Sequence, residues 1–146
     1  VFSIITVLLM ACGHEEEDSN DVAISRNGGQ SSHNTGQNCL SCHQSGNEYI
    51  FSTAGSVYQQ QNLTAPLPNV KILFHDGPNA SGNLIHSIEV DALGNFYTTD
   101  AITWGNGLYV SVEVPGKPIT SSMSFTVNEG ACGRCHDNKT VTVING

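Results

Sequence analysis

Two short runs carry the residues best suited to chemistry in this sequence. Each run has a cysteine, two further residues, a second cysteine and a histidine, at 39–43 and again at 132–136. Two residues between the cysteines allow both thiols to reach the vinyl groups on one edge of a porphyrin, and the following histidine then lies below the ring. The sequence therefore predicts two covalent c-type haems, attached through Cys39, Cys42, Cys132 and Cys135.

The axial ligands of the two irons follow less directly from the sequence. His43 and His136, which end the two runs, are the expected proximal ligands. His33 precedes Cys39 by six residues, and six extended residues reach roughly 20 Å, so His33 could bind the iron opposite His43. The full set of distal candidates is His33, Met123, His75 and His86.

The remaining distal candidates have competing explanations. Met123 alternates with Phe125 and Val127, which favours packing in the core over binding to iron. His75 and His86 belong to neighbouring apolar segments, where the alternation puts His75 on the outer side and His86 on the core side. For both histidines, ligation and a structural role stay open.

Zinc and disulfides are the main alternatives for the cysteines. Four cysteines in two pairs match a tetrahedral zinc site, and each pair could instead close a disulfide. Zinc ribbons usually bring their pairs together over a short spacer, whereas roughly ninety residues separate these two pairs. A histidine follows both pairs, and covalent haem is the interpretation that uses it.

The first residues predict export. Residues 1–11 are apolar and resemble the hydrophobic region of a secretory signal peptide. The stretch Leu9–Cys12 resembles a bacterial lipobox, so we expect Cys12 to be lipidated. Residues 12–32 are polar and partly acidic, and we expect them to form a tether. The expected protein is periplasmic or on the cell surface, anchored to the outer membrane.

The charge balance limits the classes of partner. Lys and Arg total 5 against 13 Asp and Glu, which gives a formal net charge of −8. Such a balance excludes the basic surface that binds nucleic acid, and it favours redox partner proteins with a basic docking surface.

The elements that must position the two runs are predicted to be strands. Short segments rich in Val, Ile, Phe and Tyr alternate with segments rich in Gly, Pro, Asn and Asp, which favour turns. No stretch between 50 and 130 has sustained helical periodicity. This pattern predicts an all-β, antiparallel sandwich. The expected strand segments are 55–59, 69–75, 83–90, 95–100, 107–114 and 123–127.

The order of these segments resembles a carboxypeptidase-regulatory-like domain. The resemblance is clearest at 91–97, "DALGNFY", where Gly94 suits a tight turn and Phe96 starts a core-facing strand. It implies an immunoglobulin-like or transthyretin-like β-sandwich over residues 52–128, without catalytic machinery. Two short haem-binding segments, 33–51 and 129–146, would flank it. As a whole, the chain resembles a small dihaem c-type cytochrome lipoprotein.

The expected function is transfer of single electrons by the two haems. Because the runs flank a sandwich, we expect the haems at its opposite poles, with self-association that passes electrons head-to-tail between molecules. The alternative is that both flanks fold back to one side and stack the haems within one molecule. One alternative is an enzyme, a dihaem peroxidase or a reductase with one open haem. A second alternative is a surface adhesion or assembly module in which the haems are accessory.

Overall fold

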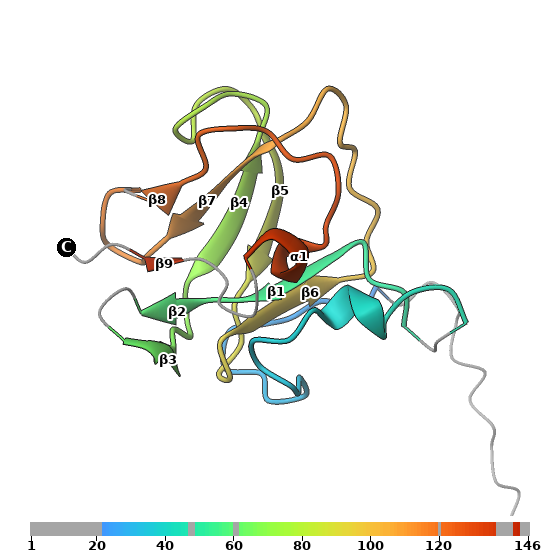
Figure 1. Cartoon of the computed structure of the whole chain (residues 1–146). Helices are drawn as coiled ribbons and strands as arrows, with labels where there is room; N and C mark the ends of the chain where they lie inside the picture. The colour runs from blue at the N-terminus through green and yellow to red at the C-terminus, as the bar shows by residue number, and fades with distance from the viewer. Residues whose placement is uncertain (1–21, 47–48, 60–61, 120, 137–141, 144–146) are drawn as a thin grey trace, which may run out of the picture.

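The computed structural model describes residues 22–46, 49–59, 62–119, 121–136 and 142–143, and these residues form short strands with two single helical turns (Figure 1). The helical turns are the 3-10 helix η1 (Cys39–Ser41) and the α-helix α1 (Cys132–Cys135). The strands are β1 (Thr53–Ser56), β2 (Tyr58–Gln59), β3 (Asn62–Pro66), β4 (Lys71–His75), β5 (Leu84–Glu89), β6 (Asn95–Thr98), β7 (Tyr109–Glu113), β8 (Ser121–Ser122) and β9 (Thr142–Val143). The predicted all-β class is confirmed.

The strands form three small sheets. The largest has the order β5-β4-β7-β8, and β1 pairs with β6 in a second sheet. The third sheet has the order β3-β2-β9. All described pairings are antiparallel except β2 with β9, which is parallel.

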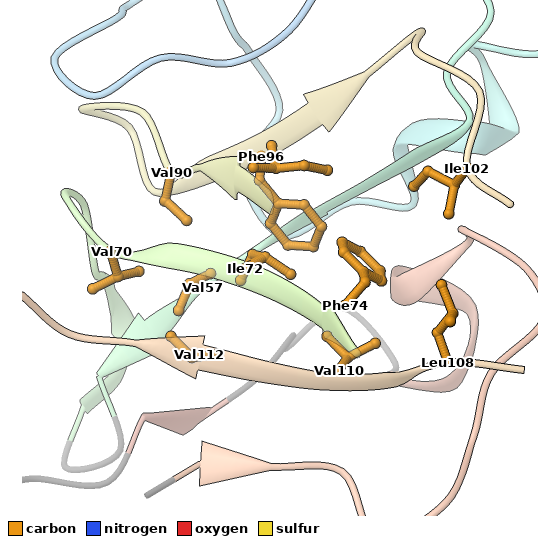
Figure 2. Packing of buried hydrophobic residues seen from close by; sticks show 11 residues of the cluster. Val57, Val70, Ile72, Phe74, Val90, Phe96, Ile102, Leu108, Val110 and Val112 are labelled. Carbon is orange, nitrogen blue, oxygen red and sulfur yellow. The ribbon is translucent and has the colours of Figure 1, made fainter. Parts of the chain in front are cut away.

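A single hydrophobic cluster lies between β1 and β6 on one side and β4 and β7 on the other (Figure 2). Ile72 and Phe74 of β4 are fully buried, because alternate residues of this strand face the cluster. Phe96 of β6 points into the same space, as the sequence predicts. The other buried members are Val57, Val70, Ile88, Val90, Ile102, Leu108, Val110 and Val112.

Most predicted strand segments correspond to observed strands. The expected segments 69–75, 83–90, 95–100 and 107–114 contain β4, β5, β6 and β7. Strand β3 overlaps the segment 64–69, in which Pro66 and Pro68 favour a turn over a strand. Pro66 occupies the end of β3, on the edge of its sheet, where a missing N–H donor costs little. The segment 123–127 forms no strand of its own, but Val127 makes an isolated bridge to Leu108 and the Met123 N–H donates to the Val110 carbonyl over 2.8 Å.

The segment 22–32, expected within the tether, instead packs along β6. Ile24 forms a bridge with Thr98, and the Ser25 backbone N–H donates to the Tyr97 carbonyl over 3.0 Å. The buried Ser25 hydroxyl donates to the Glu89 carbonyl over 2.6 Å. Backbone and hydroxyl hydrogen bonds, which leave no hydrophobic pattern in the sequence, hold this segment in place.

The predicted signal peptide at 1–11, Cys12 and the tether up to residue 21 lie outside the described residues. Within the described ranges, no helix has the length and apolar character needed to cross a membrane.

Candidate haem-attachment site

The two cysteine runs lie next to one another against β1. Helix α1 and the turn η1 both contact this strand (Figure 1). Ala131 forms a parallel bridge with Ala54, and the Gly130 carbonyl accepts a hydrogen bond from the Ala54 N–H over 3.1 Å. The expectation that the runs lie at opposite poles is therefore wrong. Residues 130–132 fold back along β1, which brings the second run to the first run.

Glycines allow this close approach. A Cβ atom on Gly133 would lie 3.0 Å from the Cα of Asn38, the residue before the first run. A Cβ on Gly55 of β1 would lie 3.1 Å from the Cβ of Cys132. Glycine at these positions lets the backbones of the two runs and of β1 pack in direct contact.

The four cysteines are present as thiols with unequal surroundings. Cys42 and Cys135 are exposed, whereas Cys39 and Cys132 are half-buried, and Cys132 packs against the hydrophobic cluster. Burial raises the pKa of the Cys132 thiol from 9.0 to about 11, and the neighbouring Cys39 and Cys135 thiols add to the rise. Burial also raises the pKa of Cys39. Each run thus offers one sheltered and one accessible sulfur.

The imidazole of His43 is held from two sides. Its Nδ1 lies 3.2 Å from the Tyr49 carbonyl oxygen. Because a carbonyl can only accept, Nδ1 carries the proton and Nε2 keeps its lone pair. The ring also stacks on Phe51, with 4.2 Å between ring centroids, and Phe51 stacks in turn on Tyr97 at 4.9 Å. A metal-binding histidine typically has this arrangement, with one nitrogen on a carbonyl and the other available.

His33 lies beside His43, as the sequence predicts for a distal ligand. The two ring centroids are 5.8 Å apart and the ring planes are inclined by 45°. Two imidazoles that bind one metal ion from opposite sides, through metal–nitrogen bonds of about 2.0 Å, have ring centres roughly 6 Å apart. The spacing of this pair fits a shared iron.

A pocket of about 560 Å³ opens between these two histidines and the first run. Its volume lies within the range of cofactor and ligand pockets, about 300–1,000 Å³. A second hollow, of about 310 Å³, lies between the first run and α1, where Ile50, Ala131 and Arg134 line it. The larger pocket is lined by both histidines, Cys39, Cys42 and the aromatic residues Tyr49, Phe51 and Tyr97.

The other distal candidates line neither pocket. Met123 packs against the hydrophobic cluster, and the ring centroid of His86 is 6.4 Å from that of Phe74. His75 was expected on the outer side of β4, yet it is only 7% exposed. That side of β4 is covered as well, since Leu73 on the same side is equally buried.

The second run has fewer described partners. The His136 backbone N–H donates to the Cys132 carbonyl over 3.2 Å, which closes the single turn of α1. Arg134 forms an exposed ion pair with Glu129 at 2.8 Å. Among the described residues, no second histidine or methionine is recorded in contact with His136. In the described ranges the second run thus offers His136 as its one candidate ligand for a metal.

The described side chains do not supply a complete zinc site. In the part of the chain that the structure describes, no group of three or more His, Cys, Asp and Glu side chains could hold a metal ion by itself. Zinc takes about four protein donors, whereas a porphyrin brings four nitrogens and needs axial ligands alone.

Sequence reasoning missed Tyr49 and Phe51. The signal available was a short aromatic-rich stretch, "EYIF" at 48–51, which follows the first run after four residues. Comparison of the chain with protein-family models, with curated proteins and with solved structures gives no match.

Proposed function

We propose that the chain is a dihaem c-type cytochrome that carries single electrons. The observation that carries the proposal is the His33–His43 pair beside Cys39 and Cys42, with His43 held through Nδ1 by the Tyr49 carbonyl. When bound, each haem supplies a one-electron couple between ferric and ferrous iron. The chain supplies thioether sulfurs from its cysteines and axial nitrogens from its histidines.

The surroundings of the first run suit a carrier. Tyr49 and Ile50 are 46% and 54% exposed, and each lines one of the two hollows beside the cysteines. A flat apolar cofactor over these side chains would remove them from water, which favours binding. Phe51 and Tyr97 fix the orientation of the His43 ring, so the ligand needs little rearrangement during a redox cycle.

Electrons would pass between the two haems inside one molecule. The contact of Gly133 with Asn38 brings the two attachment runs together, so the short path lies within the chain. The reason for expecting head-to-tail transfer, a separation of the runs by the length of a strand, no longer holds. Transfer between molecules and self-association remain secondary proposals.

The proposal also covers the fold type, the membrane anchor and the partners of the chain. We propose a sandwich of immunoglobulin-like or transthyretin-like type, with the β1–β6 sheet facing β4 and β7 across the hydrophobic cluster. Lipidation of Cys12 would anchor an exported protein to the outer membrane. The net charge of −8 favours basic redox partners and no nucleic acid.

Two alternatives are separable from this proposal. A peroxidase or reductase needs an iron with an open coordination position. Such a position would lie at the second run, because His136 is its one candidate ligand. A surface adhesion or assembly module would keep its function after loss of His43 and His136.

A redox titration of the haem-loaded protein, followed by its absorption spectrum, tests the proposal. We expect two reversible one-electron steps and no turnover of hydrogen peroxide. Sustained peroxide reduction together with carbon monoxide binding at the second haem would instead favour the enzyme. As a matched pair, His43→Ala should alter one redox step, whereas His75→Ala, outside both pockets, should alter neither.

A further inference from the structure

A buried polar pair lies beneath the loop that carries His33. Ser56 of β1 and Asn95 of β6 are direct partners across the two strands. Both are buried, and the Ser56 hydroxyl donates to the Asn95 side-chain oxygen over 2.6 Å. The Asn95 backbone N–H donates to the Asp91 carboxylate over 2.9 Å, which fixes the residue at the end of its turn. The pair is thus a rigid part of the sheet.

This pair binds the loop on both sides of His33. The Asn95 side-chain amide donates to the hydroxyls of Ser32 and Thr35, each over 2.9 Å. The N–H of Gly36 donates to the Ser56 hydroxyl over 2.8 Å. Ser32 directly precedes His33 and Thr35 follows it by two residues. His33 therefore lies in a short loop, residues 32–36, that is hydrogen-bonded to the sheet on both sides of the histidine.

The loop 32–36 has a backbone conformation that few residue types adopt. Asn34 and Gly36 have φ of 54° and 87°, in the left-handed region, and the Gln37 N–H closes the turn onto the Asn34 carbonyl over 3.0 Å. Asn and Gly are the residue types that tolerate this conformation. Because His33 itself is exposed, packing of its side chain does not hold the ring in place. The loop 32–36 and its hydrogen bonds to the sheet hold the ring 5.8 Å from His43.

We propose that Asn95 and Ser56 are positioning residues that hold His33 in place as the distal ligand of the first haem. This inference rests on the proposed function. A ligand on a loose loop would lose conformational entropy each time it bound the iron, and anchoring the loop removes that loss in advance. Without the anchors, the distal position of the first haem should open.

Carbon monoxide affinity of the full-length, haem-loaded protein tests the inference, because carbon monoxide competes with His33 for the iron. The double variant Ser32→Ala, Thr35→Val removes the two hydroxyls and leaves the buried pair in place. Each lost hydrogen bond shifts such an equilibrium about five-fold, so loss of the two bonds to Asn95 should raise the affinity of one haem up to about 25-fold. Asn95→Ala should act in the same direction. His33→Ala gives the fully open reference.

Asn83→Ala is the matched control, because Asn83 also donates from its side chain, to Asp76 over 2.8 Å, in a loop that lines neither pocket. It should leave the affinity unchanged. Equal affinity in the double variant and the unchanged protein would overturn the inference, and so would an unchanged affinity in His33→Ala. Faster hydrogen exchange at the Gly36 amide in the double variant is a second expected result. Haem content is measured first by mass, so a protein without haem counts against the proposed function instead.

Discussion

At the residue scale, His43 shows how local contacts select one chemical role. The Tyr49 carbonyl fixes the proton on Nδ1, and the stacked Phe51 ring limits rotation. Nε2 is left as the basic nitrogen, and the His33 ring, 5.8 Å away, lines the same pocket. Spacing in the sequence singled out both histidines, and their binding to iron stays a prediction. The aromatic support was not predictable, because Tyr97 reaches Phe51 only through the pairing of β1 with β6.

Cys132 leads to a prediction on alkaline stability in the chain prepared without haem. A thiol whose pKa is raised on folding, here from 9.0 to about 11, contributes stability that is fully present below pH 9. That contribution is lost as the pH rises toward 11, by up to about 3 kcal/mol. The difference in unfolding free energy between the unchanged chain and Cys132→Ala should therefore shrink over this range, as measured by urea unfolding.

Tyr58 and Tyr97 also have raised pKa values, so the comparison with a variant is needed to isolate the thiol. Gly105→Ala is the control, because it removes no titratable group and the added carbon contacts no other atom within 4 Å, so its difference should stay constant with pH. A difference for Cys132→Ala that does not change between pH 8 and 11 would contradict the assignment.

At the scale of elements, β1 is the strand that both runs share. All four of its residues are buried, and it pairs with β6 along its whole length. Near its start, the Gly130 carbonyl accepts from the Ala54 N–H and from the Thr53 hydroxyl, at 3.1 and 3.0 Å. The fold thus uses one strand to align the two attachment runs.

Gly130→Ala tests this alignment. A Cβ at Gly130 would collide with the Ser52 carbonyl and with Thr53, both backbone neighbours that cannot move independently. We expect a loss of unfolding free energy of about 1–3 kcal/mol beyond that of Gly105→Ala. Gly105 is the control, because it has φ of 53° but no atom within 4 Å of the added carbon. Equal losses in the two variants would show that the segment does not pack against β1 as described.

Much of the fold was predictable from alternation, and the failures have a common cause. Strands β4 and β7 have buried apolar residues at alternate positions, Ile72 with Phe74 and Val110 with Val112, so their pattern is visible in the sequence. Residues 22–32 join the sheet through backbone bonds and the Ser25 hydroxyl, which leave no such pattern. The position of α1 depends on Gly130 and Gly133, whose role appears only when Ser52 and Asn38 are brought beside them.

At the scale of the whole molecule, the charge predicts how the protein meets its partners. With a formal charge of −8, electron exchange with a basic soluble c-type cytochrome should slow about ten-fold between low and physiological salt. Stopped-flow kinetics measures this rate. Ferricyanide, an anionic oxidant, is the control and should react faster as salt rises. A rate with the basic partner that is independent of salt would argue against electrostatic docking.

The central claim is that both runs hold haem. Intact mass spectrometry of the protein from a host with cytochrome c maturation tests it most directly, with the double variants Cys39→Ala, Cys42→Ala and Cys132→Ala, Cys135→Ala beside it. The account predicts a covalent mass gain of two haems for the unchanged chain and of one for each double variant. A chain that carries no covalent haem, or one haem in the unchanged protein, would contradict it.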